Sequence, residues 1–390
     1  MPSILEKLRI LGEAAKYDLC ASTASPRAHT PGSIGKAATT GVCHSFLPDG
    51  RCISLLKVLI TNQCIHDCAY CVNSTSNMKG KKRVSTSFNP EELAQLTIGF
   101  YLRNYIEGLF ISSGIGKSAE CQAEIMHETL ELLRLKYKFD GYIHAKVLPG
   151  INLDNLKRIT ELADRVSINV ELPNKNRFAE TCSTKDYQND IIRVTKWLPD
   201  LQSRGHIPAG YTTQYVIGAA SETDKEILES IFEFYTTNWD FKRQYYSTCL
   251  PIDNKQKSFP RSFFQREHRL YQIDWLRRIY KFTSKELMTI VNDEGFIPLK
   301  EDPKITLARR NHDLFPIDIN DCKYIDLMRV PGIGQLSATR IVKLQNQGVK
   351  ITKIQQLKSI GVVLKRAIPF LTIGEKTQLT LDNFTKAIGK

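Results

Sequence analysis

Three cysteines fall close together in one short segment, Thr61–Asn73, which reads TNQCIHDCAYCVN. The spacing C-x3-C-x2-C is formed by Cys64, Cys68 and Cys71, and no fourth cysteine follows at a matching interval. A closed structural metal site usually takes four protein ligands, so this segment is one ligand short. Any fold that holds it must bring three thiols to one place and leave a position open beside them.

Three kinds of site fit such a segment. The first is structural zinc, with His66 or a distant cysteine as the fourth ligand. The second is a redox pair of cysteines. In the third, three thiolates bind three irons of a 4Fe–4S cluster, and the fourth iron stays open to a non-protein ligand. Zinc ribbons usually have two separated C-x2-C pairs, so this single group, with Tyr70 before its last cysteine, favours the cluster.

The other cysteines do not repeat this spacing. Cys20, Cys43 and Cys52 precede the group, where they can hold a second cluster or be buried thiols, and no two of them have ligand-like C-x2-C spacing. Three of the four further along have no motif around them and are interpreted as core residues: Cys121, Cys182 and Cys249.

The N-terminal stretch MPSILEKLRILGEAAKYDL is not typical of a signal peptide, because its apolar residues recur at helical spacing and Glu6 and Glu13 interrupt them. No apolar run in the sequence approaches the ~20 residues that a membrane-spanning helix needs. We therefore expect a cytoplasmic protein. Disulfides are rare in that compartment, and grouped cysteines there usually bind metal.

Short apolar runs alternate with longer amphipathic stretches between residues 55 and 250. Helix start signals lie between the runs; Asn89-Pro90-Glu91-Glu92 offers an N-cap, a proline at the first helical position and an acidic first turn. This alternation predicts parallel strands joined by helices. It fits an incomplete β/α barrel and a doubly wound sheet equally well. The predicted strands are Leu55–Thr61, Leu109–Ser113, Tyr142–Val147, Arg165–Glu171, Thr213–Ile217 and Arg243–Thr248.

Four segments are predicted along the chain. Residues 1–54 read as an N-terminal helix and a loop-rich cap, because Ser, Thr, Gly and Pro crowd positions 22–50. Residues 55–250 hold the strand–helix alternation, and residues 251–320 read as a mostly helical extension. Residues 321–390 read as a separate, small helical domain, so the fold class is α/β with an all-α domain at the C-terminus.

The cysteine group, just after a predicted strand and with Tyr70 before its last member, resembles that of the radical S-adenosylmethionine (radical SAM) superfamily. The resemblance covers about residues 55–250 and implies a partial β/α barrel. It also implies that Cys64, Cys68 and Cys71 bind a 4Fe–4S cluster whose open iron binds S-adenosylmethionine. In that superfamily, reductive cleavage of this cofactor yields a 5′-deoxyadenosyl radical that removes a hydrogen atom from the substrate.

Two of the predicted strand ends resemble cofactor-binding parts of the superfamily, whose active site lies at the carboxyl ends of the barrel strands. Ser112, Ser113 and Gly114 stand where the superfamily commonly has a Gly-Gly-Glu-like stretch that contacts the methionyl amino group. The Glu is absent here, which leaves backbone carbonyls or a Ser hydroxyl for that contact. Gly218 resembles the glycine of the fifth strand, whose backbone approaches the adenine.

Two other predicted strands carry polar residues on one face. Ser167, Asn169 and Glu171 alternate and so point the same way, and burying them is costly unless partners satisfy them. Binding a ribose and a carboxylate would do so, and so would a structural hydrogen-bond network. His144 and Lys146 share a face in the same manner and can contact S-adenosylmethionine, the substrate or Glu171.

A hairpin pattern occupies Tyr324–Gln345, which reads YIDLMRVPGIGQLSATRIVKLQ. Gly332 and Gly334 let the backbone turn sharply, and the helix that follows offers free N–H groups to an anion. Arg340 and Lys343 lie on that helix. The pattern resembles the helix-hairpin-helix motif, which binds a DNA phosphate without reading sequence; an ordinary helical hairpin is the alternative.

The charge balance supports a polyanion partner for this domain. Residues 323–390 hold twelve Lys and Arg against three Asp and Glu, which accounts for +9 of the chain's net +13. A basic tail on a nearly neutral body is typical of nucleic-acid binding. A second, weaker copy of the hairpin pattern follows in Leu357–Leu371.

The whole chain resembles a family of radical SAM proteins associated with DNA modification or repair. The stretches GEAAKYDLCAS, CHSFLPDGRCISLLKVLITNQC and FYLRNYIEGLFISSG carry this resemblance. It implies DNA as the substrate, a uracil-DNA-glycosylase-like partner and, from the superfamily, a flavodoxin- or ferredoxin-type electron donor. It leaves the reaction open and assigns no catalytic residue. Two alternatives remain, namely radical modification of tRNA or rRNA and a DNA-bound iron–sulfur protein that does not turn over.

Overall fold

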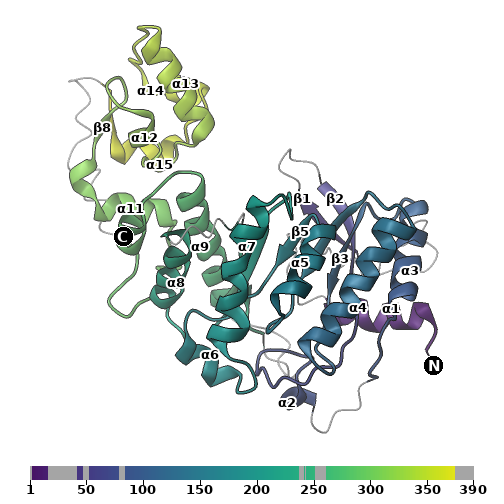
Figure 1. Cartoon of the computed structure of the whole chain (residues 1–390). Helices are drawn as coiled ribbons and strands as arrows, with labels where there is room; N and C mark the ends of the chain where they lie inside the picture. Colours follow the sequence, from purple (N-terminus) through teal and green to yellow (C-terminus); the bar gives the residue numbers. More distant parts are fainter. Residues whose placement is uncertain are drawn as a thin grey trace, which may run out of the picture. The chain divides into compact units, whose positions relative to one another are not determined.

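Parallel strands dominate the first of two compact units in the computed structural model (Figure 1). Unit 1 comprises Met1–Glu222 and Glu229–Ser258, and unit 2 comprises Thr223–Leu228 and Phe259–Lys390. The structure describes residues 2–15, 42–46, 52–78, 84–236, 241, 243–250 and 261–373.

Unit 1 contains a seven-stranded sheet whose strand order follows the sequence from β1 to β7. The first pair is antiparallel, and every later strand runs parallel to its predecessor. A doubly wound sheet would reverse its strand order at a switch point, so the partial β/α barrel is confirmed as a half-barrel of six parallel strands. The strands are β1 (Val42–Phe46), β2 (Cys52–Leu59), β3 (Gly108–Ser112), β4 (Tyr142–Lys146), β5 (Arg165–Ser167), β6 (Tyr211–Ile217) and β7 (Arg243–Thr248).

Helices connect the parallel strands, and Figure 1 shows α3, α4, α5 and α7 covering one face of the sheet. Asn89 caps α3 and forms a capping box with Glu92, with Pro90 in the first turn, so the predicted start signal operates as expected. The helical segments are α1 (Ile4–Ala14), α2 (Thr75–Met78), α3 (Pro90–Leu102), α4 (Ala119–Glu131), η2 (Leu132–Lys136), α5 (Leu153–Leu162), α6 (Lys175–Thr181), η3 (Tyr187–Ile192), α7 (Arg193–Ser203) and α8 (Asp224–Thr236).

The strand β1 lies in the segment that the sequence analysis assigned to loops, so that assignment is wrong for Val42–Phe46. Its residues pair antiparallel with Cys52–Leu56 at the edge of the sheet. Pairing with an existing strand can order a segment that has weak strand preference of its own. The second-cluster hypothesis lies outside the described residues, because Cys20 and the side chains of Cys43 and Cys52 are not described.

Unit 2 is mainly helical. Its segment from residue 317 to residue 372, which contains the predicted hairpins, packs around a core that includes Ile333, Ile341, Leu357 and Val362. A short parallel pair, β8 with β9, joins the two ends of that segment. Among the described residues of the chain, no helix is both long and apolar enough to cross a lipid bilayer. The elements are α9 (Arg261–Arg278), α10 (Ser284–Met288), α11 (Pro303–Arg310), η4 (His312–Leu314), β8 (Ile317–Asp318), α12 (Tyr324–Leu327), α13 (Gln335–Asn346), α14 (Ile354–Ser359), α15 (Leu364–Ala367), η5 (Ile368–Phe370) and β9 (Leu371–Thr372).

Candidate active site and nucleic-acid interface

The segment Thr61–Asn73, which we name the cysteine loop, follows β2 and lies against the residues that follow β3. The Ile65 amide donates to the Ile115 carbonyl at 2.8 Å, and the Gly114 amide donates to the Thr61 carbonyl at 2.8 Å. A Cβ on Gly114 would stand 2.2 Å from the Gln63 carbonyl oxygen. Glycine is therefore needed at position 114 for the strand end to approach the loop.

Cys64, Cys68 and Cys71 line one cavity of about 110 Å³, which we name the cysteine cavity. Most of its other walls come from the carboxyl ends of the neighbouring parallel strands, the position of active sites in β/α barrels, and the rest come from the cysteine loop and Lys185. Those walls are formed by Leu59, His66, Tyr70, Asn73, Ser112, Ser113, Gly114, Ile115, Lys146, Val147, Leu148, Pro149, Asn169, Glu171 and Lys185.

A fourth thiol lies beside the loop. The Sγ atoms of Cys68 and Cys182 are 3.5 Å apart, and the hydrogen bond between them lowers the pKa of Cys68 and raises that of Cys182. Within the described residues, no three His, Cys, Asp or Glu side chains are close enough to hold a single metal ion, whereas a 4Fe–4S cluster binds each thiolate through a different iron. The sequence analysis placed Cys182 in the core; it is buried, and it also contacts a predicted cluster ligand.

Asp67 attaches the cysteine loop to the segment after α6. Its carboxylate accepts from the Ser183 hydroxyl at 2.5 Å and the Thr184 hydroxyl at 2.8 Å, and the Ala69 amide donates to the Thr181 carbonyl at 2.8 Å. Burial alone would raise the pKa of Asp67, but the hydrogen bonds outweigh it and lower the pKa. We name Asp67, Ser183 and Thr184 the Asp67 anchor.

Lys185 brings a positive charge to the cysteine cavity. Burial opposes its protonated form, but the nearby Cys68 and Glu171 outweigh that effect and raise the pKa of Lys185. A cation here stabilises thiolate and carboxylate groups that burial would otherwise neutralise. The sequence analysis missed Lys185 and the contact of Cys182, since residues 68 and 182 are 114 positions apart and no motif surrounds the later segment.

The candidates Ser112, Ser113 and Gly114 lie together in the wall of the cysteine cavity. The Ser113 hydroxyl is buried and has no hydrogen-bond partner among the described residues. The same holds for the Tyr70 hydroxyl and the Asn73 side-chain carbonyl. A buried polar atom without a partner costs about 1–3 kcal/mol, so a polar ligand in this cavity would be stabilised.

The cavity is also lined by Lys146, Asn169 and Glu171. Asn169 and Glu171 do not reach it as alternating residues of one strand. The strand β5 ends at Ser167, and Glu171 takes a positive φ of 67°. Its backbone pairs with β6, since the Glu171 amide donates to the Gln214 carbonyl at 2.9 Å. Such a conformation is uncommon for a residue other than glycine and persists where the surroundings enforce it, often at functional sites.

Two candidates do not reach this cavity. The ring of His144 packs edge-on against Phe110, with 4.6 Å between ring centroids, although His144 shares β4 with Lys146. Gly218 has a φ of +85°, and its amide donates to the Glu222 carboxylate at 2.5 Å. The positive φ is by itself a reason for glycine at position 218. Neither His144 nor Gly218 lines the cysteine cavity.

The donor set of the cavity fits an iron–sulfur cluster and a polar cofactor. Thiolates are the ligands of such clusters, three thiols share this cavity, and its wall carries polar atoms without partners among the described residues. The volume of about 110 Å³ is below the roughly 300–1,000 Å³ of typical cofactor sites. A cluster and a cofactor together therefore need more space than this cavity encloses.

The hairpin in unit 2 requires glycine at position 332 more strictly than at position 334. Gly332 has a φ of +84°, and a Cβ there would stand 2.5 Å from the Val363 carbonyl oxygen. The Val363 amide donates to the Gly332 carbonyl at 2.9 Å, which connects the first hairpin turn to the second, where Gly361 has a φ of +94°. Gly334 has an extended backbone that any residue can adopt. At this position glycine therefore affects only how closely other groups can approach.

The helix α13 begins immediately after Gly334 and presents an open N-terminus. Its first internal bond runs from the Ala338 amide to the Gly334 carbonyl at 2.9 Å. The amides of residues 335–337 donate to no other group in the part of the chain that the structure describes. Arg340 is exposed and donates to the Ile360 carbonyl at 3.1 Å, and Lys343 is exposed on the same helix. Free amides and nearby cations form an anion-binding arrangement.

Comparisons with known proteins agree with both regions. The model of the Radical SAM superfamily matches residues 58–234, and that of the helix-hairpin-helix motif matches residues 315–367. No curated protein matches the chain.

Solved structures that resemble the chain include the FeFe-hydrogenase maturase HydG from Carboxydothermus hydrogenoformans, at 14% identity and a TM-score of 0.41, with 58% of this chain and 51% of that one covered. Methylornithine synthase (PylB) matches at 11% identity and a TM-score of 0.40, covering 77% and 84%. The protein anSMEcpe with bound AdoMet matches at 12% identity and a TM-score of 0.39, covering 78% and 98%. The match spans about half the length of the hydrogenase maturase.

Proposed function

We propose that this chain, a radical SAM superfamily enzyme that also carries a helix-hairpin-helix motif, binds a 4Fe–4S cluster and S-adenosylmethionine and acts on DNA. The combination of two regions in one chain carries the proposal. Three thiols of one loop line a cavity with a polar wall, in a chain whose second unit presents free helix amides and cations. The first region fits redox cleavage of a sulfonium cofactor, and the second fits a phosphate backbone.

Cys64, Cys68 and Cys71 would hold the cluster, and the Asp67 anchor would keep their loop in place. Ser113, Asn169 and Glu171 line the same cavity and offer hydrogen-bonding groups for the amino group and ribose of S-adenosylmethionine, while Lys146 offers a cation for its carboxylate. When bound, the cluster and S-adenosylmethionine supply a 5′-deoxyadenosyl radical that removes a hydrogen atom from the substrate. These residues would bind and orient the cofactor.

The proposed substrate is DNA, and the proposed outcome is modification or repair of a base or sugar. The amides that follow Gly334 would bind a phosphate, and Arg340 and Lys343 would add charge. This contact carries no sequence information, so the half-barrel would select the nucleotide, which must be flipped out or already unpaired to enter a cavity. A flavodoxin- or ferredoxin-type donor would supply the electron, and a uracil-DNA-glycosylase-like protein is the proposed partner.

The decisive experiment uses the anaerobically reconstituted full-length chain, dithionite and S-adenosylmethionine. We expect four irons per chain, 5′-deoxyadenosine as a product, and a mass change in a defined DNA oligonucleotide. Binding to duplex DNA and to structured RNA is compared at two salt concentrations; a steep salt dependence for DNA alone supports the DNA substrate. A mass change confined to RNA would favour tRNA or rRNA modification, and bound iron without 5′-deoxyadenosine would leave a non-catalytic DNA-binding protein.

A further inference from the structure

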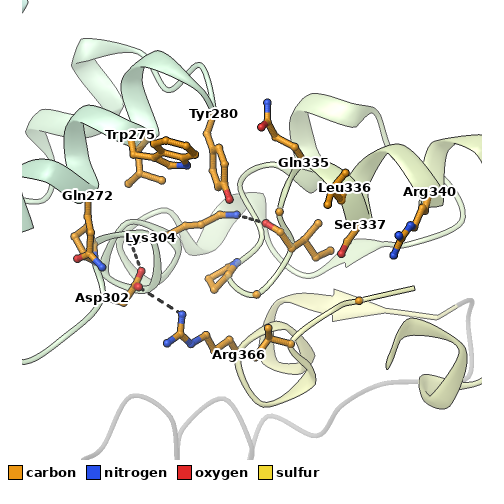
Figure 2. A pocket seen from close by; sticks show the side chains of 18 residues that line it. Gln272, Trp275, Tyr280, Asp302, Lys304, Gln335, Leu336, Ser337, Arg340 and Arg366 are labelled. Carbon is orange, nitrogen blue, oxygen red and sulfur yellow. Dashed lines mark hydrogen bonds and ion pairs between the residues drawn. The ribbon is translucent and has the colours of Figure 1, made fainter. Parts of the chain in front are cut away.

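A larger cavity, of about 590 Å³, lies within unit 2 beside the hairpin turn (Figure 2). We name it the hairpin cavity. Its walls come from α9 and Tyr280, from the start of α11, and from the turns of both hairpins. Its volume falls within the roughly 300–1,000 Å³ of small-molecule and cofactor sites. A phosphate bound at the hairpin amides does not need a cavity of this size. The cavity has room for a ligand larger than a phosphate.

Aromatic side chains form one wall of the hairpin cavity. Trp275 of α9 is 50% exposed, and Figure 2 shows it next to Tyr280, whose ring is drawn between Trp275 and the hairpin. The Tyr280 hydroxyl lies 3.4 Å from the position that a Cβ on Gly334 would take. A half-exposed tryptophan in the wall of a cavity is a surface on which a flat ring can stack.

A buried lysine attaches this wall to the hairpin turn. Lys304 of α11 donates to the Ile333 carbonyl at 2.6 Å, and its ammonium lies 4.5 Å from the centroid of the Tyr280 ring. Lys304 is 7% exposed, so little water competes for its hydrogen bond to Ile333. The aromatic wall and the hairpin turn are therefore held together as one site.

The charges around the hairpin cavity favour an anionic ligand with a hydrogen-bonding edge. Arg340 and Arg366 both line it. Among the described residues that line it, the only carboxylate belongs to Asp302, 3.6 Å from Arg366. Gln272 adds an amide on the α9 side. Together with the free amides at the start of α13, the cavity offers an anion-binding end and an aromatic end with polar groups beside it.

We propose that the hairpin cavity binds an unpaired nucleotide of DNA, with its base stacked on Trp275 and its phosphate at the free amides of residues 335–337. This inference rests on the proposed function and deepens it, because it assigns DNA with an unpaired nucleotide as the preferred substrate class. A base in an intact duplex is stacked between its neighbours and cannot reach Trp275. Asp302 and Gln272 would hydrogen-bond the exposed base edge, whose groups pairing no longer occupies.

Affinity measurements on the full-length chain test this inference. The probes are a short DNA duplex and the same duplex with one unpaired thymidine, at a single salt concentration. Stacking on an aromatic side chain typically contributes about 10-fold to 100-fold in affinity per base, so wild type should prefer the second probe by about that factor. Trp275→Ala should remove the preference, and Trp275→Phe, which keeps an aromatic ring, should retain most of it.

Phe264→Ala is the matched control, since Phe264 is an exposed aromatic residue of the same helix, 48% exposed, that does not line the cavity. It should keep the preference. Circular dichroism of each variant checks that the helices are intact. A preference that survives Trp275→Ala, or wild-type binding to the duplex with no preference, overturns the inference and leaves the proposed function standing. Failure of wild type to bind either DNA overturns the proposed function itself.

Discussion

The cysteine cavity of unit 1 and the hairpin cavity of unit 2 are built in different ways. In the first, side chains from distant parts of the sequence meet, as Cys68 meets Cys182 across 114 positions. In the second, a local turn and the helix after it supply backbone amides, and Gly332 sets the geometry. The first site therefore depends on side-chain chemistry held by the tertiary fold, whereas the anion-binding end of the second depends on the backbone conformation of a local turn.

This difference predicts that substitutions in the two regions have separable effects, and Cys68→Ala is expected to have the largest. Removing one of three thiolates should reduce bound iron, the visible absorbance of the cluster and 5′-deoxyadenosine to background. DNA affinity should stay within about twofold of wild type, because distant sites act independently. Cys121→Ala, at a half-buried thiol of α4, is the control and should keep its iron. Full iron retention in Cys68→Ala would contradict the ligand assignment.

Gly332→Ala should damage the hairpin more than Gly348→Ala does. Both glycines have positive φ, which costs about 1–2 kcal/mol for a residue with a side chain, but only at Gly332 would the new Cβ clash, 2.5 Å from the Val363 oxygen, whereas nothing lies within 4 Å at Gly348. We expect DNA affinity to fall by about 10-fold or more in Gly332→Ala, with 5′-deoxyadenosine formation in the absence of DNA retained. Equal effects of the two changes on binding would show that the turn geometry is not required.

Asp67→Asn tests the attachment of the cysteine loop. The substitution keeps the size of the side chain and removes its charge, so the hydrogen bonds from Ser183 and Thr184 weaken. Hydrogen bonds to a charged group contribute about 1.5–3 kcal/mol, and the loop should release iron to a chelator faster by a corresponding factor. The exposed Asp140 provides the control, Asp140→Asn. Equal release rates for the two variants would rule out an anchoring role for Asp67.

A smaller effect concerns the pH dependence of stability in unit 2. Burial lowers the pKa of Lys304 to about 7, and Asp302 opposes this only in part. An unfolded lysine keeps its proton to about pH 10.4, so the unfolded state binds more protons between pH 7 and that value. The free energy of unfolding therefore rises with pH in this window, by at most about 1.4 kcal/mol per pH unit.

Lys304→Met lacks this titration, so wild type should gain stability relative to the variant as the pH rises. Denaturant midpoints of both proteins at about pH 7 and about pH 9 measure the gain. A difference between the two proteins that is the same at both pH values would mean that Lys304 does not titrate in this range.

Much of the fold could be predicted because its signals are local. Each of the six predicted strands is found, from β2 to β7, since apolar runs and helix start signals act within a few residues. The strand β1 could not be predicted, because pairing with β2 orders it. In the same way, the sequence places His144 and Lys146 on one strand, but only packing directs Lys146 to the cysteine cavity and the His144 ring to Phe110.

The sequence by itself determined the group of three thiols and the hairpin turn, because residues a few positions apart stay together in any fold. Only the tertiary structure decided that Cys182 and Lys185 join the cysteine loop, and that Trp275 and Lys304 form a cavity with the hairpin. These contacts join segments far apart in the chain. They depend on which surfaces pack together, and a local pattern of residues does not specify that packing.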